Sequence, residues 1–224
     1  MKPRGSSDRP IREIPMSRRL ALSVVLAAFS GFAAAAPVSY RIDADHTDVI
    51  ASWSHLGFSN PVAHFGQVDG TIIYDAANVG ASSVEVTIPL AGLDSHVAAL
   101  DRHLRSAELF DAGKYPVIAF KSRRVEALGK SRLRVTGDLT VKGVTRTAVL
   151  DVTLNKVGEH PMAKRQAIGF DAATSLKRSD FGIAYAVPAV SDEVRIRITT
   201  EAMVPKAEGD VPARAKTSIP PKTR

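Results

Sequence analysis

The side chains with the widest chemical range in this sequence are six histidines, spread far apart along the chain: His46, His55, His64, His96, His103 and His160. No pair forms His-x-His or His-Glu-x-x-His, the compact spacings typical of zinc sites. The chain also has no cysteine. Disulfides, thiolate metal sites and a cysteine nucleophile are therefore excluded, and the sequence predicts no metal site and no cofactor.

The common nucleophile and phosphate-binding motifs are also missing from the sequence. It contains no Gly-x-Ser-x-Gly, no Ser-x-x-Lys set and no glycine-rich phosphate loop. Acidic residues are scattered singly, so no carboxylate pair stands out. We therefore interpret the chain as a binding protein without catalysis. The alternative is an enzyme that acts on an amphiphile with His55 or His103 as its general base.

His55 has the most distinctive sequence surroundings of the six histidines. It ends the run 49–55 (VIASWSH), in which Val49, Ala51, Trp53 and His55 share one face of a strand. If Trp53 points inward, so does His55. A buried imidazole needs a hydrogen-bonding partner, which is either another part of the protein or a ligand.

Alternating apolar and polar residues predict that strands position these side chains. Residues 84–88 (VEVTI) and 194–199 (VRIRIT) alternate strictly, which places apolar side chains on one strand face and polar ones on the other. Many short antiparallel strands with one polar face predict an all-β sandwich or an up-and-down barrel. The alternating runs predict eight strands, at 47–55, 67–75, 82–90, 116–126, 131–142, 144–156, 165–175 and 190–202.

One segment follows a helical period instead. Its apolar residues recur at Leu93, Val97, Leu100 and Leu104, and Asp94 is a suitable N-cap. This spacing predicts a single helix at about residues 94–105, on the flank or at the mouth of the barrel.

Charge separates the two ends of the 224-residue chain from its middle. Residues 1–35 hold six basic and two acidic residues, and residues 205–224 hold five and two. Residues 36–204 then carry 19 of each sign, although the whole chain has a net charge of +7. The positive charge belongs to the ends, so it does not indicate a nucleic-acid-binding surface. We predict no nucleic-acid partner.

Residues 1–35 predict a cleaved export signal. Arg18 and Arg19 precede the apolar run 20–29, and small residues at 33–36 provide a cleavage site. The apolar stretch is shorter than the roughly 20 strongly apolar residues that a membrane span needs. We expect cleavage after Ala35, export by the Sec route and a periplasmic location.

Residues 205–224 predict a disordered, basic, proline-rich tail. The segment has four prolines and almost no large apolar side chains, so folding it would not bury enough surface to offset the entropy lost. Its charge leaves a transient contact with an anionic membrane surface open.

Several motifs follow one another in order between residues 40 and 203. The most specific are 55–59 (HLGFS), 101–106 (DRHLRS), 114–116 (KYP), 137–145 (GDLTVKGVT) and 176–182 (LKRSDFG). Together they resemble the YceI-like family of exported polyisoprenoid-binding proteins with a lipocalin-like barrel. The resemblance implies an antiparallel eight-stranded up-and-down barrel over residues 39–204, with an apolar tunnel for a polyprenyl chain or a related amphiphile. It leaves a homodimer open.

The implied tunnel gives each candidate site residue a role. Chain burial alone can hold such a ligand, because each CH₂ removed from water contributes about 0.8 kcal/mol. The apolar lining would comprise Val49, Ala51, Trp53, Phe58, Phe65, Leu104, Phe110, Phe120, Phe170 and Phe181. Alternatively, these side chains simply fill the core. The polar head would be bound near the mouth by His55, His103, Arg178 and Ser179.

Arg178 is suited to a phosphate on the ligand head, because a guanidinium forms strong, charge-assisted hydrogen bonds with phosphate oxygens. An ion pair between Arg178 and Asp180 at the end of a strand is the alternative.

Overall fold

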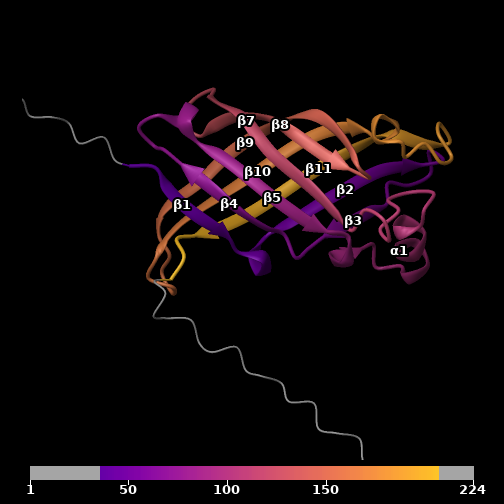
Figure 1. The fold of residues 1–224 in the computed structure, drawn as a ribbon, viewed down its shortest axis with the longest axis horizontal. Helices are drawn as coiled ribbons and strands as arrows, with labels where there is room; N and C mark the ends of the chain where they lie inside the picture. The colour runs from indigo at the N-terminus through magenta and orange to yellow at the C-terminus, as the bar shows by residue number, and fades with distance from the viewer. Residues whose placement is uncertain (1–35, 207–224) are drawn as a thin grey trace, which may run out of the picture. The chain divides into compact units, whose positions relative to one another are not determined.

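The strands close into an antiparallel barrel in the computed structural model, which describes residues 36–206 (Figure 1). Each strand of the barrel pairs with the next, and β1 pairs with β11 to close the ring. The prediction of an eight-stranded antiparallel barrel is confirmed. The barrel strands are β1 (Val38–Ile42), β4 (Asp69–Tyr74), β5 (Ser83–Pro89), β7 (Val117–Ala127), β8 (Arg132–Val141), β9 (Val144–Glu159), β10 (Gln166–Lys177) and β11 (Val190–Met203).

Three further strands extend the sheet from β11 towards the helix. They are β2 (Asp48–His55), β3 (Val62–Phe65) and β6 (Leu93–Asp94). The sequence prediction counted β2 as a barrel strand and missed β1, β3 and β6. β1 and β2 pair with successive parts of β11, Arg41 opposite Met203 and Asp48 opposite Thr199. They therefore share one edge of β11, on either side of a short 3-10 helix.

The helix α1 (Ala98–Arg105) begins four residues later than predicted. Asp94 belongs to β6, where it pairs with His64. His96 then adopts a left-handed backbone conformation with φ of 62°, which a helix interior does not allow. Val97 consequently takes the N-cap position. The remaining helices in the described part of the chain are the 3-10 turns η1 (Ala44–His46), η2 (Val79–Ala81), η3 (Leu90–Gly92) and η4 (Arg178–Phe181).

The turn between β8 and β9 shows how the local sequence sets a barrel connection. Lys142 and Gly143 both have positive φ, 49° and 74°. Two such residues form a turn whose twist matches that of the flanking strands. Val141 and Val144 therefore pair directly, and β8 and β9 stay in register over ten residue pairs from that turn.

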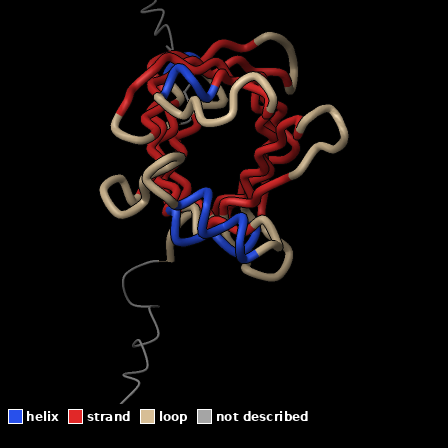
Figure 2. Tube along the Cα trace, turned by 90° about the vertical axis from the view of Figure 1, so that its right-hand side faces the viewer, coloured by secondary structure: helices blue, strands red, loops and turns tan. Residues whose placement is uncertain are grey.

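The two faces of the barrel wall differ in chemistry, as the alternation predicted. On the outside, Lys121 and Glu85 lie opposite each other on neighbouring strands, with Nζ 3.0 Å from Oε2. On the inside, Phe120 and Val86 occupy the adjacent opposed pair. Figure 2 shows the strands as a ring viewed from the end where α1 lies. No helix within residues 36–206 is long and apolar enough to cross a membrane.

The predicted export signal at residues 1–35 lies outside the described residues. The same holds for the predicted tail at 205–224, apart from Pro205 and Lys206.

Candidate functional site

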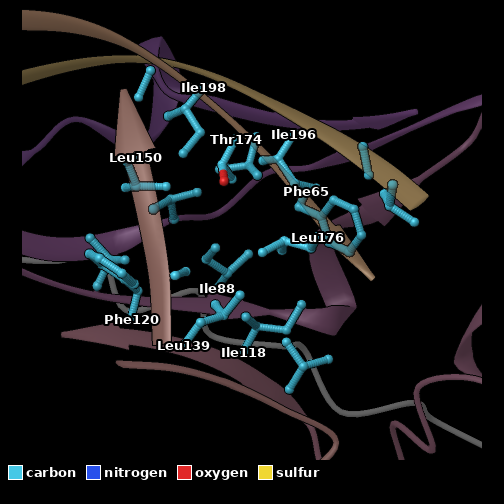
Figure 3. Close-up of a pocket in the computed structure, with 18 of the residues that line it drawn as sticks. Phe65, Ile88, Ile118, Phe120, Leu139, Leu150, Thr174, Leu176, Ile196 and Ile198 are labelled. Carbon is cyan, nitrogen blue, oxygen red and sulfur yellow. The ribbon is translucent and has the colours of Figure 1, made fainter. Parts of the chain in front are cut away.

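The barrel encloses a cavity of about 670 Å³. Its volume falls in the range of roughly 300–1,000 Å³ that is usual for small-molecule sites. Figure 3 shows side chains converging on this space, most of them apolar. They include Phe65, Ile88, Ile118, Phe120, Leu139, Leu150, Leu176, Ile196 and Ile198, with the hydroxyl of Thr174 among them.

The cavity reaches from one end of the barrel to the other. Its wall includes Tyr185 in the loop before β11 and, towards the opposite end, Ile73 and Leu133. The 11 residues of β7 span about 36 Å at roughly 3.3 Å per residue. A strand tilt of about 40° leaves ~28 Å along the barrel axis. The space therefore suits a long, thin, apolar molecule.

Nine of the ten residues predicted to line the interior lie in the cavity wall. They are Val49, Ala51, Trp53, Phe65, Leu104, Phe110, Phe120, Phe170 and Phe181. Their contact with a ligand stays a prediction, but they surround a cavity rather than fill a solid core. The wall also contains many aliphatic residues on β5 and on β7 to β11, which the prediction did not name.

Phe58 was wrongly predicted to line the interior. Its side chain is 92% exposed and lies in the turn between β2 and β3. The alternation that orients Trp53 and His55 ends there, because Leu56 and Gly57 both adopt positive φ and redirect the chain.

His55 lines the cavity at its mouth, but it is exposed rather than buried. The strand face predicted from Val49, Ala51 and Trp53 does point inward. β2 leaves the enclosed part of the barrel before His55, so the imidazole reaches both the cavity and solvent. It can hydrogen-bond a ligand head without the desolvation cost of a buried ring.

The helix α1 places His103 beside the same mouth. Leu100, His103 and Leu104 follow helical spacing and all line the cavity. The Nε2 atom of His103 lies 3.2 Å from Oε2 of Glu108. The imidazole also packs edge-on against Tyr185, with ring centroids 5.2 Å apart.

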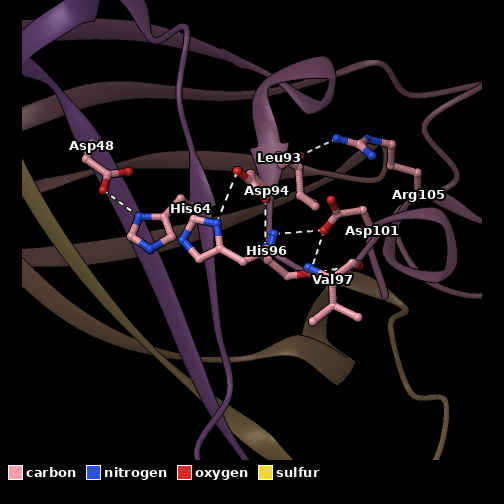
Figure 4. A network of polar contacts seen from close by, with 9 residues as sticks. Asp48, His64, Leu93, Asp94, His96, Val97, Asp101 and Arg105 are labelled. Atoms are coloured by element: carbon pink, nitrogen blue, oxygen red, sulfur yellow. Dashed lines mark hydrogen bonds and ion pairs between the residues drawn. The ribbon is translucent and has the colours of Figure 1, made fainter. Parts of the chain in front are cut away.

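Two residues of α1 tie the helix to the preceding segment (Figure 4). Asp101 accepts hydrogen bonds through Oδ1 from the N–H of Ser95 at 2.8 Å and from its Oγ at 2.5 Å. These bonds lower the pKa of the Asp101 carboxyl. Arg105 donates to the carbonyl oxygens of Leu90, at 2.9 Å, and of Leu93. These contacts fix the helix with its apolar face towards the cavity.

The guanidinium of Arg178 is hydrogen-bonded to backbone carbonyl groups. Nε donates to the carbonyl oxygen of Ser191 at 2.8 Å, and Nη2 donates to that of Val190 at 2.8 Å. Nη1 donates to the carbonyl oxygens of Ile183 and Tyr185, at 3.0 and 2.8 Å. Four of the five N–H groups of the guanidinium are thus used. The guanidinium thus holds the loop before β11, and Arg178 also lines the cavity. Its role as a phosphate ligand stays a prediction.

Ser179 is also engaged within the protein and lies outside the cavity wall. Its Oγ donates to Oδ2 of Asp192 at 2.7 Å, and its N–H donates to Oδ1 at 2.8 Å. Both bonds lower the pKa of the Asp192 carboxyl. The predicted role of Ser179 in binding a ligand head is therefore corrected. The alternative Arg178–Asp180 ion pair is absent from the described part of the chain.

Tyr185 is an aromatic mouth residue that the sequence prediction missed, and Leu56 and Ala186 also line the cavity there. Tyr185 lines the cavity from the loop 182–189, where no alternating pattern indicates which way a side chain points. Within residues 36–206, no cluster of three or more histidine and acidic side chains is arranged to hold a metal ion.

A closed eight-stranded barrel with an apolar interior and an accessible mouth defines the class of ligand-holding β-barrels. Within that class, the chain belongs to the YceI-like family, whose family model matches residues 40–202. A UPF0312 protein of Vibrio cholerae is 40% identical over 152 residues, which cover 67% of this chain and 80% of that protein. Protein YceI of Escherichia coli O157:H7 is 36% identical over 189 residues, covering 84% and 97%.

Solved structures show the same fold. BcnA of Burkholderia cenocepacia has a TM-score of 0.66 and 25% identity, covering 72% of this chain and 99% of its own. The YceI protein of Campylobacter jejuni has a TM-score of 0.62 and 30% identity, covering 68% and 90%. A polyisoprenoid-binding domain from Saccharophagus degradans has a TM-score of 0.59 and 14% identity, covering 74% and 98%. This last similarity concerns the fold alone.

Proposed function

We propose that this chain is an exported carrier that holds a long-chain isoprenoid, or a related amphiphilic lipid, inside the barrel. The observation that carries the proposal is the cavity of about 670 Å³ and its aliphatic and aromatic wall. Such a wall offers few directional contacts, so it selects a ligand by length and apolar surface. Burying each CH₂ contributes about 0.8 kcal/mol, and a polyprenyl tail has many such groups.

The polar head of the ligand would remain at the mouth beside α1. His55 and His103 lie there and line the cavity, together with the phenol ring of Tyr185. Imidazole and phenol groups both donate and accept hydrogen bonds. This arrangement fits an alcohol, amide or quinone head, whereas Arg178 is already bonded to the backbone.

Two further observations support the carrier proposal. The fold is shared with a domain described as polyisoprenoid-binding, and residues 1–35 have the composition of a cleaved export signal. A periplasmic carrier would shield an apolar chain from water between membranes or enzymes. The homodimer stays a prediction.

Trp53 provides a direct test, because it is the single tryptophan of the chain and lines the cavity. Polyprenyl alcohols of increasing length should each change its fluorescence on binding. Affinity should rise by about fourfold for each additional buried CH₂ and stop rising once the cavity is full. Affinity that does not depend on chain length would contradict the proposal.

The enzyme alternative assigns a catalytic role to His55 or His103 at the mouth of the cavity. It requires chemical conversion of an amphiphile that is lost in His55→Ala or His103→Ala, whereas the carrier returns its ligand unchanged. Mass spectrometry of the ligand after prolonged incubation separates the two. Conversion that depends on either histidine would contradict the carrier proposal.

A further inference from the structure

Four large apolar side chains are exposed at the end of the barrel where α1 lies. Phe58 is 92% exposed and Leu56 52%, both in the turn between β2 and β3. Tyr185, in the loop before β11, is 51% exposed, and Val97, at the start of α1, is 53% exposed. We call these four residues the apolar rim. Large apolar side chains grouped in this way on a soluble domain mark interaction sites.

The segments that carry the apolar rim contain no charged residue. Residues 55–60 (HLGFSN), 96–100 (HVAAL) and 182–190 (GIAYAVPAV) lack Asp, Glu, Lys and Arg, although these make up 24% of the chain. The turns at the opposite end differ, since residues 160–165 (HPMAKR) include Lys164 and Arg165. The three segments that carry the apolar rim are therefore uncharged, although charged residues such as Arg102 and Glu108 lie on and beside α1.

The apolar rim is continuous with the cavity. At the α1 end, four residues line the cavity and are also exposed: His55, Leu56, Tyr185 and Ala186. At the opposite end, Ile73 is the only exposed residue among those that line the cavity in the described part of the chain. The segments also contact one another. The N–H of Leu56 donates to the carbonyl oxygen of Ala189 at 3.0 Å, and Tyr185 packs against His103 of α1.

The turn that displays Phe58 has a defined backbone. The N–H of His55 donates to the carbonyl oxygen of Ser59 at 2.9 Å, and that of Phe58 donates to the carbonyl oxygen of His55 at 3.0 Å. Leu56 adopts φ of 54°, a left-handed conformation that is costly for a branched apolar residue. A hydrogen-bonded turn thus holds two apolar side chains in solvent.

We propose that the apolar rim docks on the surface of a lipid bilayer, with the mouth of the cavity facing the bilayer. This inference rests on the proposed function, because an amphiphilic ligand resides in a bilayer when it is not in the barrel. The composition fits this partner. Tyrosine favours the interface between water and hydrocarbon, and phenylalanine and leucine are typical of surfaces that bury in the headgroup and acyl-chain boundary. Segments without charge avoid the cost of placing ions there. The ligand then moves between bilayer and cavity without crossing water.

Vesicle flotation with the mature chain tests the proposal. The probes are phosphatidylcholine vesicles and vesicles of phosphatidylcholine with phosphatidylglycerol, each at low and high salt. We expect the wild type to bind both, with little effect of salt. The variant Leu56→Ser/Phe58→Ser/Tyr185→Ser should bind about tenfold more weakly or worse, because its apolar contact is removed. Met162→Ser is the matched control, since Met162 is 85% exposed in the turn at the opposite end, and it should bind like the wild type.

Three results would overturn the proposal. The first is unchanged vesicle binding by the triple variant. The second is binding that disappears at high salt or on removal of residues 207–224, which would identify the basic tail as the membrane contact. The third is a dimer of the wild type, seen by light scattering, that the triple variant loses while vesicle binding is absent in both. Thermal unfolding confirms that each variant is folded.

The proposed function is tested separately by the fluorescence of Trp53, since that titration contains no bilayer. If the wild type responds in the Trp53 titration as expected, but the wild type and the triple variant bind vesicles equally well, only the docking surface is refuted. A titration without any response refutes the carrier itself.

Discussion

The imidazole of His103 meets the phenol ring of Tyr185 edge-on, with the ring centroids 5.2 Å apart. His103 belongs to α1, and Tyr185 belongs to the loop before β11. Both line the cavity. Their contact joins two segments far apart in sequence across the mouth of the barrel, so it can control how quickly a ligand leaves.

Replacing His103 should accelerate release of the ligand. An aromatic pair contributes about 0.5–1.5 kcal/mol beyond the area it buries, so His103→Ala should speed dissociation by up to about tenfold. Stopped-flow displacement of a fluorescent polyprenyl probe measures this rate. His103→Phe retains an edge-on ring and should release the probe at nearly the wild-type rate. If His103→Phe releases it as fast as His103→Ala, the imidazole instead holds the ligand by a hydrogen bond.

Arg178 should be a determinant of stability rather than of affinity. Arg178→Ala leaves four carbonyl oxygens without their charged donor and should lower the free energy of unfolding by about 3 kcal/mol. The melting temperature should fall by roughly 6–12 °C for a domain of this size. Arg195→Ala is the control, because Arg195 is an exposed residue with a surface ion pair, and its effect should stay within about 0.5 kcal/mol.

The outcome that contradicts this assignment is equally measurable. If Arg178→Ala keeps its melting temperature but loses affinity for a prenyl phosphate relative to the prenyl alcohol, the guanidinium binds the ligand head.

The attachment of α1 should weaken in acid. Hydrogen bonds from Ser95 lower the pKa of Asp101 in the folded protein. The carboxylate therefore stabilises the fold above its unfolded pKa of about 4, and this contribution is lost as pH falls through the lower folded pKa. Asp101→Asn should melt below the wild type at pH 7, and the difference should close in acid.

Melting temperatures of Asp101→Asn and wild type between pH 2 and 7 provide the test. Asp171→Asn, at an exposed position on β10, is the control and should show no such closing gap. A difference that stays constant down to pH 2 would mean that the carboxylate charge does not contribute.

The sequence was sufficient to predict the barrel because its strands are long and half-buried. β11 alternates from Val194 to Thr199, and each apolar residue of that run faces the cavity. Other elements depend on contacts between distant segments. β6 has two residues and exists through its pairing with β3, and α1 starts after His96 because of a backbone angle that no spacing reveals.

The candidate site was predictable to the extent that strand alternation defines it. Trp53 and Phe120 lie on inward faces as expected. Phe58 has the same apolar character, but it sits in a turn, where residue type alone does not indicate direction. Arg178 is basic and near the mouth, yet its partners are carbonyl groups that only the folded loop brings together.

Two neighbouring alanines on β10 allow the central claim to be tested within one strand. Ala172 lines the cavity, whereas Ala173 is exposed on the outer face. Tryptophan at position 172 should occupy the space that the ligand needs, and tryptophan at position 173 should leave that space free. Melting temperatures verify that both variants fold.

Native mass spectrometry of the wild type and of each variant, each purified from its own cell envelope, measures the mass of any bound ligand. The carrier account predicts that the wild type and Ala173→Trp carry a bound mass of isoprenoid size, and that Ala172→Trp does not. An equal bound mass in Ala172→Trp, or none in the wild type, would contradict the claim that the barrel interior holds a long-chain lipid.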